Sequence, residues 1–360
     1  MRPQKYAHVA ERFAQRIRKG DYHLHELPAE RELAAEAGVS YTTARKAVQS
    51  LVNQGLLYRQ PNGRAAVRPV EDGGERVAPA QIALLTPAWE SSTITRWRAA
   101  LARSCSCLGA SCRTVLFAHW DDPTIPNTIQ GFDGTFLIPE PEPPTESLLG
   151  MLRQCARPIV VLGSDWSRHG LRSVMLDPAV LIHGVLDHLA SLGHRTIDCF
   201  NVQPAKNDHI MQWRLWCAAQ HLTGELINDP VTPYEDPSPA AYAAIEGRLR
   251  AGQFQSKALY CTTEPAAIGA MAALIDHGLQ PGRDVAVCTS DSGSYAAFGN
   301  PSLTAMADIA REPFISVCLD WMLGRLESSW PGPLLLQPAD CHVVVRQSTV
   351  PGIKDPRRLT

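Results

Sequence analysis

The chain has 360 residues, 45% of them apolar and 19% charged, which is an ordinary globular balance with room for two or three domains. No apolar run reaches the roughly 20 residues that a membrane-spanning helix needs, and the N-terminal residues lead into no apolar signal segment. These features exclude an integral membrane protein and favour a cytoplasmic one.

The ten cysteines suit that compartment as free or buried thiols. Their closest group is Cys105, Cys107 and Cys112, which lacks both the paired C-x-x-C spacing and the matching histidines of a zinc site. We therefore expect packing cysteines and no metal.

The formal charge of −2 is unevenly distributed along the chain. Residues 1–69 carry twelve Lys and Arg against six Asp and Glu, a net charge of +6, whereas the remaining 291 residues carry 22 against 30, a net charge of −8. A small basic module on a larger acidic body predicts a polyanionic partner for the first part only.

Residues 6–17 repeat apolar side chains at helical spacing, which predicts an amphipathic helix ended by Gly20. A second helix is expected from about Ala29, followed by a tight turn at Gly38 and a third helix capped by Ser40. The third helix has an inner stripe of small and apolar residues and presents hydroxyls and cations outward. Two short helices joined by a glycine turn in this way are typical of a helix-turn-helix.

The segment GLLYRQPNGRAAVRPV that follows contains two short extended runs around Asn62-Gly63, which is a strong turn signal between strands. This pattern predicts a β-wing. Arg59, Arg64 and Arg68 make the wing basic enough to lie along DNA phosphates or to reach the minor groove.

Several features occur in order within LPAERELAAEAGVSYTTARKAVQSLVNQGLLYRQ: an L-P-x-E-R-x-L-A block, a G-V-S turn, a T-x-R-x-A core and an L-x-x-x-G-L run. With them, about the first 70 residues resemble the winged helix of the GntR regulator family. The resemblance implies that Arg31, Thr43 and Arg45 contact DNA and that Gly63 lies at the wing tip. Together with the outward positions, the predicted DNA-binding residues are Arg31, Tyr41, Thr42, Thr43, Arg45, Lys46, Gly63 and Arg64.

Two departures from that family leave the operator sequence open. Tyr41 follows the turn serine, where the family usually has an arginine. The wing reads Asn62-Gly63-Arg64-Ala65-Ala66-Val67 in place of the usual G-x-G-T-F-V type.

After a charged, Gly- and Pro-rich linker, strand patterns alternate with helix patterns, which predicts an α/β body of two lobes with parallel sheets facing a cleft. The strand segments are QIALLTP, CRTVLFA, FDGTFLIP, RPIVVLGSD, LRSVMLD, RTIDCFNV, KALYCTT and DVAVCTSD. Helices are expected at 97–108, 145–155, 178–192, 213–222, 239–251 and 265–277, whereas 119–131 leaves little room for one. The predicted parts are a winged helix at 1–69, a linker at 70–80, a two-lobed body at 81–350 and a tail at 351–360.

Enzyme motifs are missing from this body. It contains no phosphate loop, no dinucleotide G-x-G-x-x-G after a strand and no G-x-S-x-G, and the serines of SDSGSY lie where a ligand loop is expected. We therefore expect neither an enzyme nor a cofactor.

Four segments in order carry a second resemblance: DPAVLIHGVLDHLASLGHRTI, CTTEPAAIGAMAALIDHGLQPGRDVAVCTSDS, NPSLTAM and GFDGTFLIP. Over about 81–348 they resemble the LacI-type, periplasmic-binding-protein-like sensor domain. The resemblance implies a ligand site in which Asp177, Glu264 and Asp291 are acidic positions. Carboxylates that accept hydrogen bonds from hydroxyls suit sugars and other polyols.

Further side chains are candidates for that site. Trp89 and Trp166 follow first-lobe strands and could stack on a sugar face. Gln212 stands where the family commonly has an arginine, and Arg214 is close enough in sequence to substitute for it. Together with the longer Glu264, this departure predicts a ligand other than the family's usual sugars, or a weakened pocket.

These observations predict a homodimeric transcription regulator, most simply a repressor that a small polar metabolite releases from double-stranded operator DNA or tightens on it. One alternative is a winged-helix regulator whose sensor domain only dimerises. Another is a winged helix fused to an aminotransferase-like enzyme, although the body is short for that fold and Lys206 and Lys257 lack the surroundings of a Schiff-base lysine.

Overall fold

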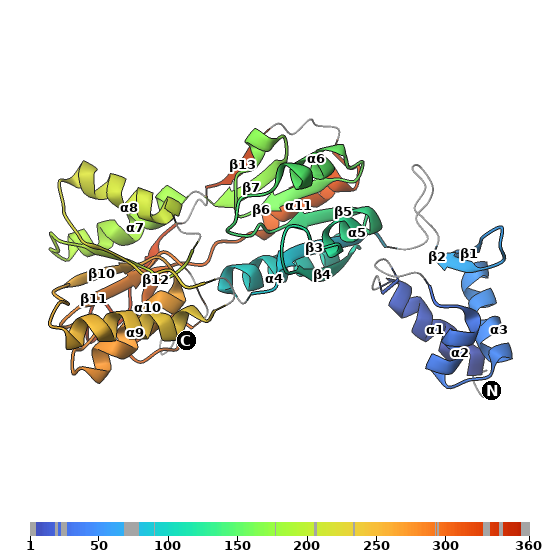
Figure 1. Ribbon diagram of the computed structural model, residues 1–360, viewed down its shortest axis with the longest axis horizontal. Helices are drawn as coiled ribbons and strands as arrows, with labels where there is room; N and C mark the ends of the chain where they lie inside the picture. The colour runs from blue at the N-terminus through green and yellow to red at the C-terminus, as the bar shows by residue number, and fades with distance from the viewer. Residues whose placement is uncertain are drawn as a thin grey trace. The chain divides into compact units, whose positions relative to one another are not determined.

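The chain divides into two compact units, and Figure 1 labels its helices and strands. The first comprises residues 1–88, 97–174 and 311–334, and the second comprises 89–96, 175–310 and 335–360. The computed structural model describes residues 5–18, 21–22, 27–67, 79–89, 91–176, 178–204, 207–232, 235–291, 293, 295–326, 332–337 and 341–353. The predicted linker and tail fall largely outside these ranges, and no helix within them is long and apolar enough to cross a membrane.

The N-terminal part of the first unit begins with three helices, as predicted: α1 (Lys5–Arg18), α2 (Glu30–Ala37) and α3 (Tyr41–Asn53). Gly38 ends α2 with a φ of 63°, a conformation that glycine adopts without strain. The hydroxyl of Ser40 then accepts the amide N–H of Thr43 at 3.3 Å and caps α3. The turn and the cap together fix the angle between the two helices.

The predicted wing is a two-stranded antiparallel ribbon of β1 (Leu57–Arg59) and β2 (Ala65–Val67), in which Leu57 pairs with Val67. Gly63 makes its turn with a φ of 82°. The three helices and the start of the wing share one core, whose largest fully buried side chains are Phe13, Leu33, Leu51 and Leu57.

The rest of the first unit is built on a six-stranded sheet with the order β13-β7-β6-β5-β3-β4. Its strands are β3 (Gln81–Pro87), β4 (Ser111–Phe117), β5 (Gly134–Leu137), β6 (Ile159–Leu162), β7 (Arg172–Leu176) and β13 (Pro333–Leu336). The helices are α4 (Ser92–Cys107, whose first turn belongs to the second unit), α5 (Thr124–Gly131), α6 (Glu146–Gln154) and α11 (Glu312–Met322). Ala83 and Leu85 face α5 and α6, whereas alternate residues such as Ile82 and Leu84 are buried on the other face.

Two helix predictions in this unit are wrong in their extent. We expected the first helix to begin at Trp97, but α4 begins at Ser92, where the Ser91 hydroxyl accepts the amide N–H of Ile94 at 3.4 Å. We expected no full helix at 119–131, but α5 forms there, and just before it the Asp122 carboxylate accepts the Thr124 amide at 2.8 Å. In both places a short polar side chain binds a backbone amide near the start of a helix that apolar periodicity does not reveal.

The second unit contains a six-stranded sheet with the order β14-β12-β11-β10-β8-β9, and β14 alone among the described pairs is antiparallel to its neighbour. Its strands are β8 (Asp198–Asn201), β9 (Leu226–Asn228), β10 (Ala258–Cys261), β11 (Ala286–Thr289), β12 (Thr304–Met306) and β14 (Val343–Val344). The helices are α7 (Pro178–Ser191), α8 (Asn207–Gln220), α9 (Pro237–Arg250) and α10 (Glu264–Asp276). The two parallel sheets confirm the predicted α/β class.

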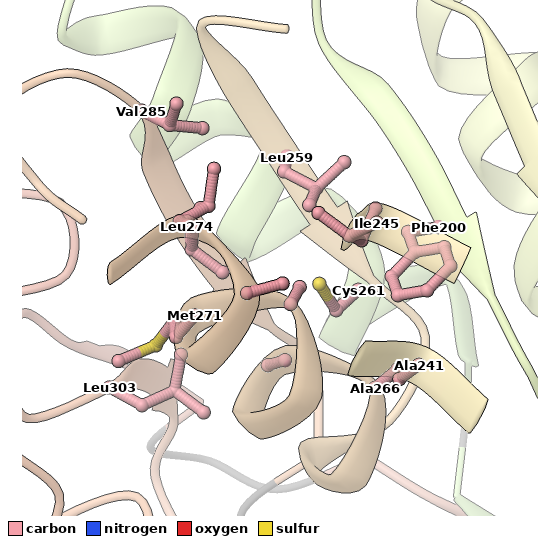
Figure 2. Packing of buried hydrophobic residues seen from close by; sticks show 14 of the residues in the cluster. Phe200, Ala241, Ile245, Leu259, Cys261, Ala266, Met271, Leu274, Val285 and Leu303 are labelled. Atoms are coloured by element: carbon pink, nitrogen blue, oxygen red, sulfur yellow. The ribbon is translucent and has the colours of Figure 1, made fainter. Parts of the chain in front are cut away.

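Side chains along β10 alternate between the two faces of the sheet, and this alternation shows which helices cover each face. Leu259 and Cys261 pack against α9 and α10, whereas Ala258 and Tyr260 pack against α7 and α8 on the opposite face. Figure 2 shows Leu259 and Cys261 among the buried side chains of the first of these two cores. Because both faces are covered, the strands are continuous buried runs, as is usual in parallel sheets.

Helices α9 and α10 approach closely at Gly269. A Cβ atom added there would lie 2.4 Å from the backbone oxygen of Ser238 and 2.6 Å from the Cβ of Ala241. Gly247, on α9, has nothing within 4 Å of the same added atom.

We predict opposite effects for alanine at these two helical glycines. Gly269→Ala forces the helices apart and should lower the free energy of unfolding by about 1–3 kcal/mol. Gly247→Ala should raise it by up to about 1 kcal/mol, because alanine favours helix and meets no neighbour. Urea unfolding measures both, and equal effects would show that the α9–α10 contact is not tight.

Candidate functional site

The first turns of α3 carry the predicted DNA-binding side chains. Tyr41, Thr42, Arg45 and Lys46 are exposed, whereas the inner stripe of the helix is fully buried. Neither Arg45 nor Lys46 forms an ion pair with any residue that the structure describes. Thr43 is half-buried, and its hydroxyl lies 2.9 Å from that of Ser40. Helix α3 thus presents two cations and two hydroxyl-bearing side chains to solvent.

Arg31 on α2 and Gly63 and Arg64 in the wing are also exposed, as expected for groups that meet a phosphate backbone. Together with Tyr41 and Arg59 they line a groove of about 340 Å³ between the start of α2, the start of α3 and the wing. The structure therefore brings the predicted residues of all three elements to one surface.

Glu30, at the start of α2, is a member of this surface that sequence reasoning missed. Its Oε1 atom accepts a hydrogen bond from the Arg59 guanidinium at 2.7 Å, and its Oε2 atom accepts one from the Tyr41 hydroxyl at 3.0 Å. Arg59 also donates to the backbone oxygen of Gly63 at 3.0 Å. We expected Arg59 to meet phosphate, but its guanidinium is engaged within the domain.

A second polar cluster lies at the carboxyl ends of the parallel strands in the second unit, where ligands of such sheets usually bind. The Asn201 amide at the end of β8 donates to the Asn228 side chain at 2.8 Å and accepts the Thr262 hydroxyl at 2.7 Å. Asn201 and Thr262 are buried, so their hydrogen bonds fix the geometry of this strand end.

Asp291, which follows β11, is the most heavily contacted acid of the cluster. It forms an ion pair with Arg96, accepts the Ser92 hydroxyl at 3.1 Å, and accepts the backbone N–H of Glu264 at 3.4 Å. Ser92 and Arg96 lie in the first turns of α4, within the stretch 89–96 of the second unit. Sequence reasoning missed both, because they lie about 200 residues before Asp291 and carry no spacing signal.

The structure brings Glu264 next to Asp291, as the resemblance implied, but its carboxyl group faces protein backbone. Glu264 is only 2% exposed, and its Oε1 atom accepts the amide N–H of Ala296 at 2.5 Å. A Cβ atom added to Gly293 would lie 1.6 Å from its Oε2 atom. Burial first, and then the charge of Asp291, raise the pKa of Glu264 to about 7.

Hydroxyl groups extend the cluster toward α8. The Tyr260 hydroxyl lies 3.0 Å from that of Ser290 and 3.2 Å from Nδ1 of His209. Gln212 is half-buried and lies one turn beyond His209, so it shares that helix face. Arg214, by contrast, is exposed.

The remaining predicted ligand residues are Trp166, Trp89 and Asp177. Trp166 is 7% exposed and packs in the core of the first unit, 5.7 Å from Trp120 between ring centroids. Trp89 is half-buried at the start of the stretch 89–96. Asp177 lies outside the described residues. Within the described ranges, no three His, Cys, Asp or Glu side chains are grouped so that they could hold a metal ion.

We predict that Glu264 makes the stability of the protein depend on pH. Because its pKa is about 7 when folded, against an ordinary value of 4.5, ionisation favours unfolding and stability should fall as pH rises from about 4.5 to 7. The change amounts to at most about 3 kcal/mol, from ~1.4 kcal/mol per pKa unit. Glu264→Gln should remove this component, so thermal unfolding curves of the two proteins should diverge across that range; a constant difference would contradict the account.

Two family models match the chain. Residues 5–67 match the model described as bacterial regulatory proteins, gntR family, and residues 186–349 match the periplasmic binding protein-like domain. The first match covers the winged helix, and the second covers most of the second unit, including its polar strand ends. A search of curated protein sequences finds no match.

Solved structures share the fold at low sequence identity. A Lac repressor dimer bound to operator and the anti-inducer ONPF is 17% identical over 79% of this chain and 100% of its own, with a TM-score of 0.62. A LacI family regulator from Arthrobacter sp. FB24 in complex with lactose is 16% identical over 76% and 100%, with a TM-score of 0.63. The transcription regulator CcpA of Lactococcus lactis is 14% identical over 75% and 99%, with a TM-score of 0.61. The chain thus joins a GntR-type winged helix-turn-helix to an effector domain of the LacI-type, periplasmic-binding-protein-like fold.

Proposed function

We propose that this chain is a ligand-responsive transcription regulator that binds operator DNA through its winged helix. The observation that carries the proposal is the exposed row of Tyr41, Thr42, Arg45 and Lys46 on a helix whose opposite side is fully buried. A capped helix that is exposed on one side and buried on the other fits a major groove, where side chains of its first turns reach base edges.

The residues of this surface divide into two roles. In this proposal Arg45 and Tyr41 contact bases, whereas the exposed cations Arg31, Lys46 and Arg64 contact phosphates. A homodimer follows from the geometry of DNA, because two such helices meet half-sites about one helical turn apart.

The effector site proposed is the polar end of the second sheet. Asp291 provides a half-buried carboxylate there beside the hydroxyl of Ser92, and such groups suit a hydroxyl-rich metabolite such as a sugar. A ligand that hydrogen-bonds Asp291 competes with Arg96 for the same carboxylate oxygens. Trp166 is not part of this site, because its ring is packed in a core of the first unit.

Regulation by linkage follows from this arrangement. An effector that binds one conformation of the chain more tightly shifts operator affinity by the ratio of its two affinities, and so releases a repressor or tightens it. The family model that matches residues 5–67 is that of bacterial regulatory proteins, and the similar solved structures named above include transcription regulators, which supports a regulator over an enzyme.

We predict that Arg45→Ala lowers affinity for a duplex selected from a randomised pool by at least tenfold, because the exposed guanidinium contacts a base edge or phosphate. Fluorescence anisotropy at several salt concentrations measures the loss. The matched control is Arg250→Ala, which removes the same charge from an exposed position on α9 and should leave affinity unchanged. Full affinity of Arg45→Ala, with an unaltered unfolding temperature, would contradict the proposed recognition surface.

A further inference from the structure

Tyr41 occupies an unusual place on the proposed recognition surface. It is the first residue of α3 and is 43% exposed, so its aromatic ring faces solvent at the end of the helix that enters the groove. Its hydroxyl, however, donates to Glu30 at 3.0 Å. The side chain therefore offers an apolar ring, while its hydrogen-bond donor is used within the protein.

Glu30 is well held in this arrangement. Its side chain is 15% exposed, and its second oxygen accepts the Arg59 guanidinium at 2.7 Å. Each carboxylate oxygen thus has one donor, one from α3 and one from the wing. A charge-assisted hydrogen bond of this kind limits the rotation of the Tyr41 side chain.

The base edges of the major groove make different demands on a side chain. Guanine offers two acceptors that suit arginine, adenine offers an acceptor and a donor that suit asparagine or glutamine, and thymine offers a methyl group that suits an apolar contact. A tyrosine whose hydroxyl hydrogen is already engaged suits neither the guanine nor the adenine contact. Its exposed ring can still make the apolar contact with the methyl group of thymine.

We propose that Tyr41 reads the methyl group of a thymine in each operator half-site, and that Glu30 is the positioning residue that holds its ring for that contact. The inference rests on the DNA-binding function proposed above and names the base that one of its residues reads. Glu30 also forms an ion pair with the wing cation Arg59, so the same carboxylate offsets part of the attraction of that cation for phosphates of any sequence. Glu30 thereby favours specific over non-specific binding.

The test uses the full-length protein and a duplex selected from a randomised pool. Each thymine of the selected half-site is replaced in turn by deoxyuridine, which removes only the methyl group. At one thymine per half-site, the wild type should lose affinity about fourfold, the effect expected from one buried methyl group. Tyr41→Phe should show a smaller loss, as Glu30→Gln should, because the ring remains without its hydrogen bond to Glu30, whereas Tyr41→Ala should bind both duplexes equally.

Thr42→Ala is the matched control, because Thr42 is the exposed neighbour of Tyr41 and carries a methyl group of its own. It should keep the sensitivity to deoxyuridine at that thymine. Glu30→Gln should reduce the fourfold effect and increase affinity for an unrelated duplex severalfold, since Arg59 is then released toward phosphate.

Three results would overturn the inference. They are a selected site in which no thymine is sensitive to deoxyuridine, a Tyr41→Phe variant that loses discrimination as Tyr41→Ala does, and a Thr42→Ala variant that alone loses it. A wild-type protein that selects no duplex at all would instead refute the proposed function. Circular dichroism and the unfolding temperature of each variant separate these results from a loss of folding.

Discussion

The parallel pairing of β8, β10 and β11 is the constraint on which the proposed effector site depends. The pairing aligns Phe200 with Cys261 and Cys261 with Thr289, so three strands end in one row. Residues that follow each strand are thereby brought together although the sequence separates them by tens of residues. These strands are buried throughout, so each polar side chain at or just beyond their ends must find a hydrogen-bonding partner.

The need for hydrogen-bonding partners explains why Glu264 and Asp291, the two acids of the cluster, have different roles. Glu264 is buried against the backbone of Gly293 and Ala296 and shapes the loop after β11. Asp291 keeps its place through Arg96 and Ser92, both from the first turns of α4. Burial first, and then the charge of Asp291, raise the pKa of Glu264 to about 7, although its backbone partner Ala296 acts in the opposite direction.

The winged helix uses a carboxylate in a similar way. Glu30 joins α2 to the first turn of α3 through Tyr41 and to the wing through Arg59. The distance between helix and wing is then set by two short side-chain contacts rather than by the core alone. These two contacts preorganise the surface that we propose binds DNA. They thereby lower the entropic cost of ordering that surface on binding.

Features of the fold that arise from local sequence could be predicted. The Gly38 turn, the Ser40 cap and the alternation of strands and helices depend on a few neighbouring residues, and the structure confirms them. Resemblance to a known domain also predicted that Glu264 and Asp291 lie together. Arg96 could not be found in this way, because its partner Asp291 lies 195 residues further along the chain. Glu30 stands in the L-P-x-E-R-x-L-A block, but that pattern does not reveal that its carboxylate binds Tyr41 and Arg59.

The central claim is that an effector and operator DNA bind to one chain with linked affinities. The most direct measurement is the affinity of the full chain for its selected duplex, titrated with pentoses, hexoses, polyols and nucleosides. The account predicts that at least one compound changes that affinity severalfold, and that the duplex changes the affinity for the compound by the same factor. Asp291→Asn should weaken this coupling, while Asp276→Asn, at an exposed acid at the opposite end of α10 from Glu264 in the same unit, should not. A compound that binds at the polar cluster without altering duplex affinity, or a panel in which none binds, would contradict the claim.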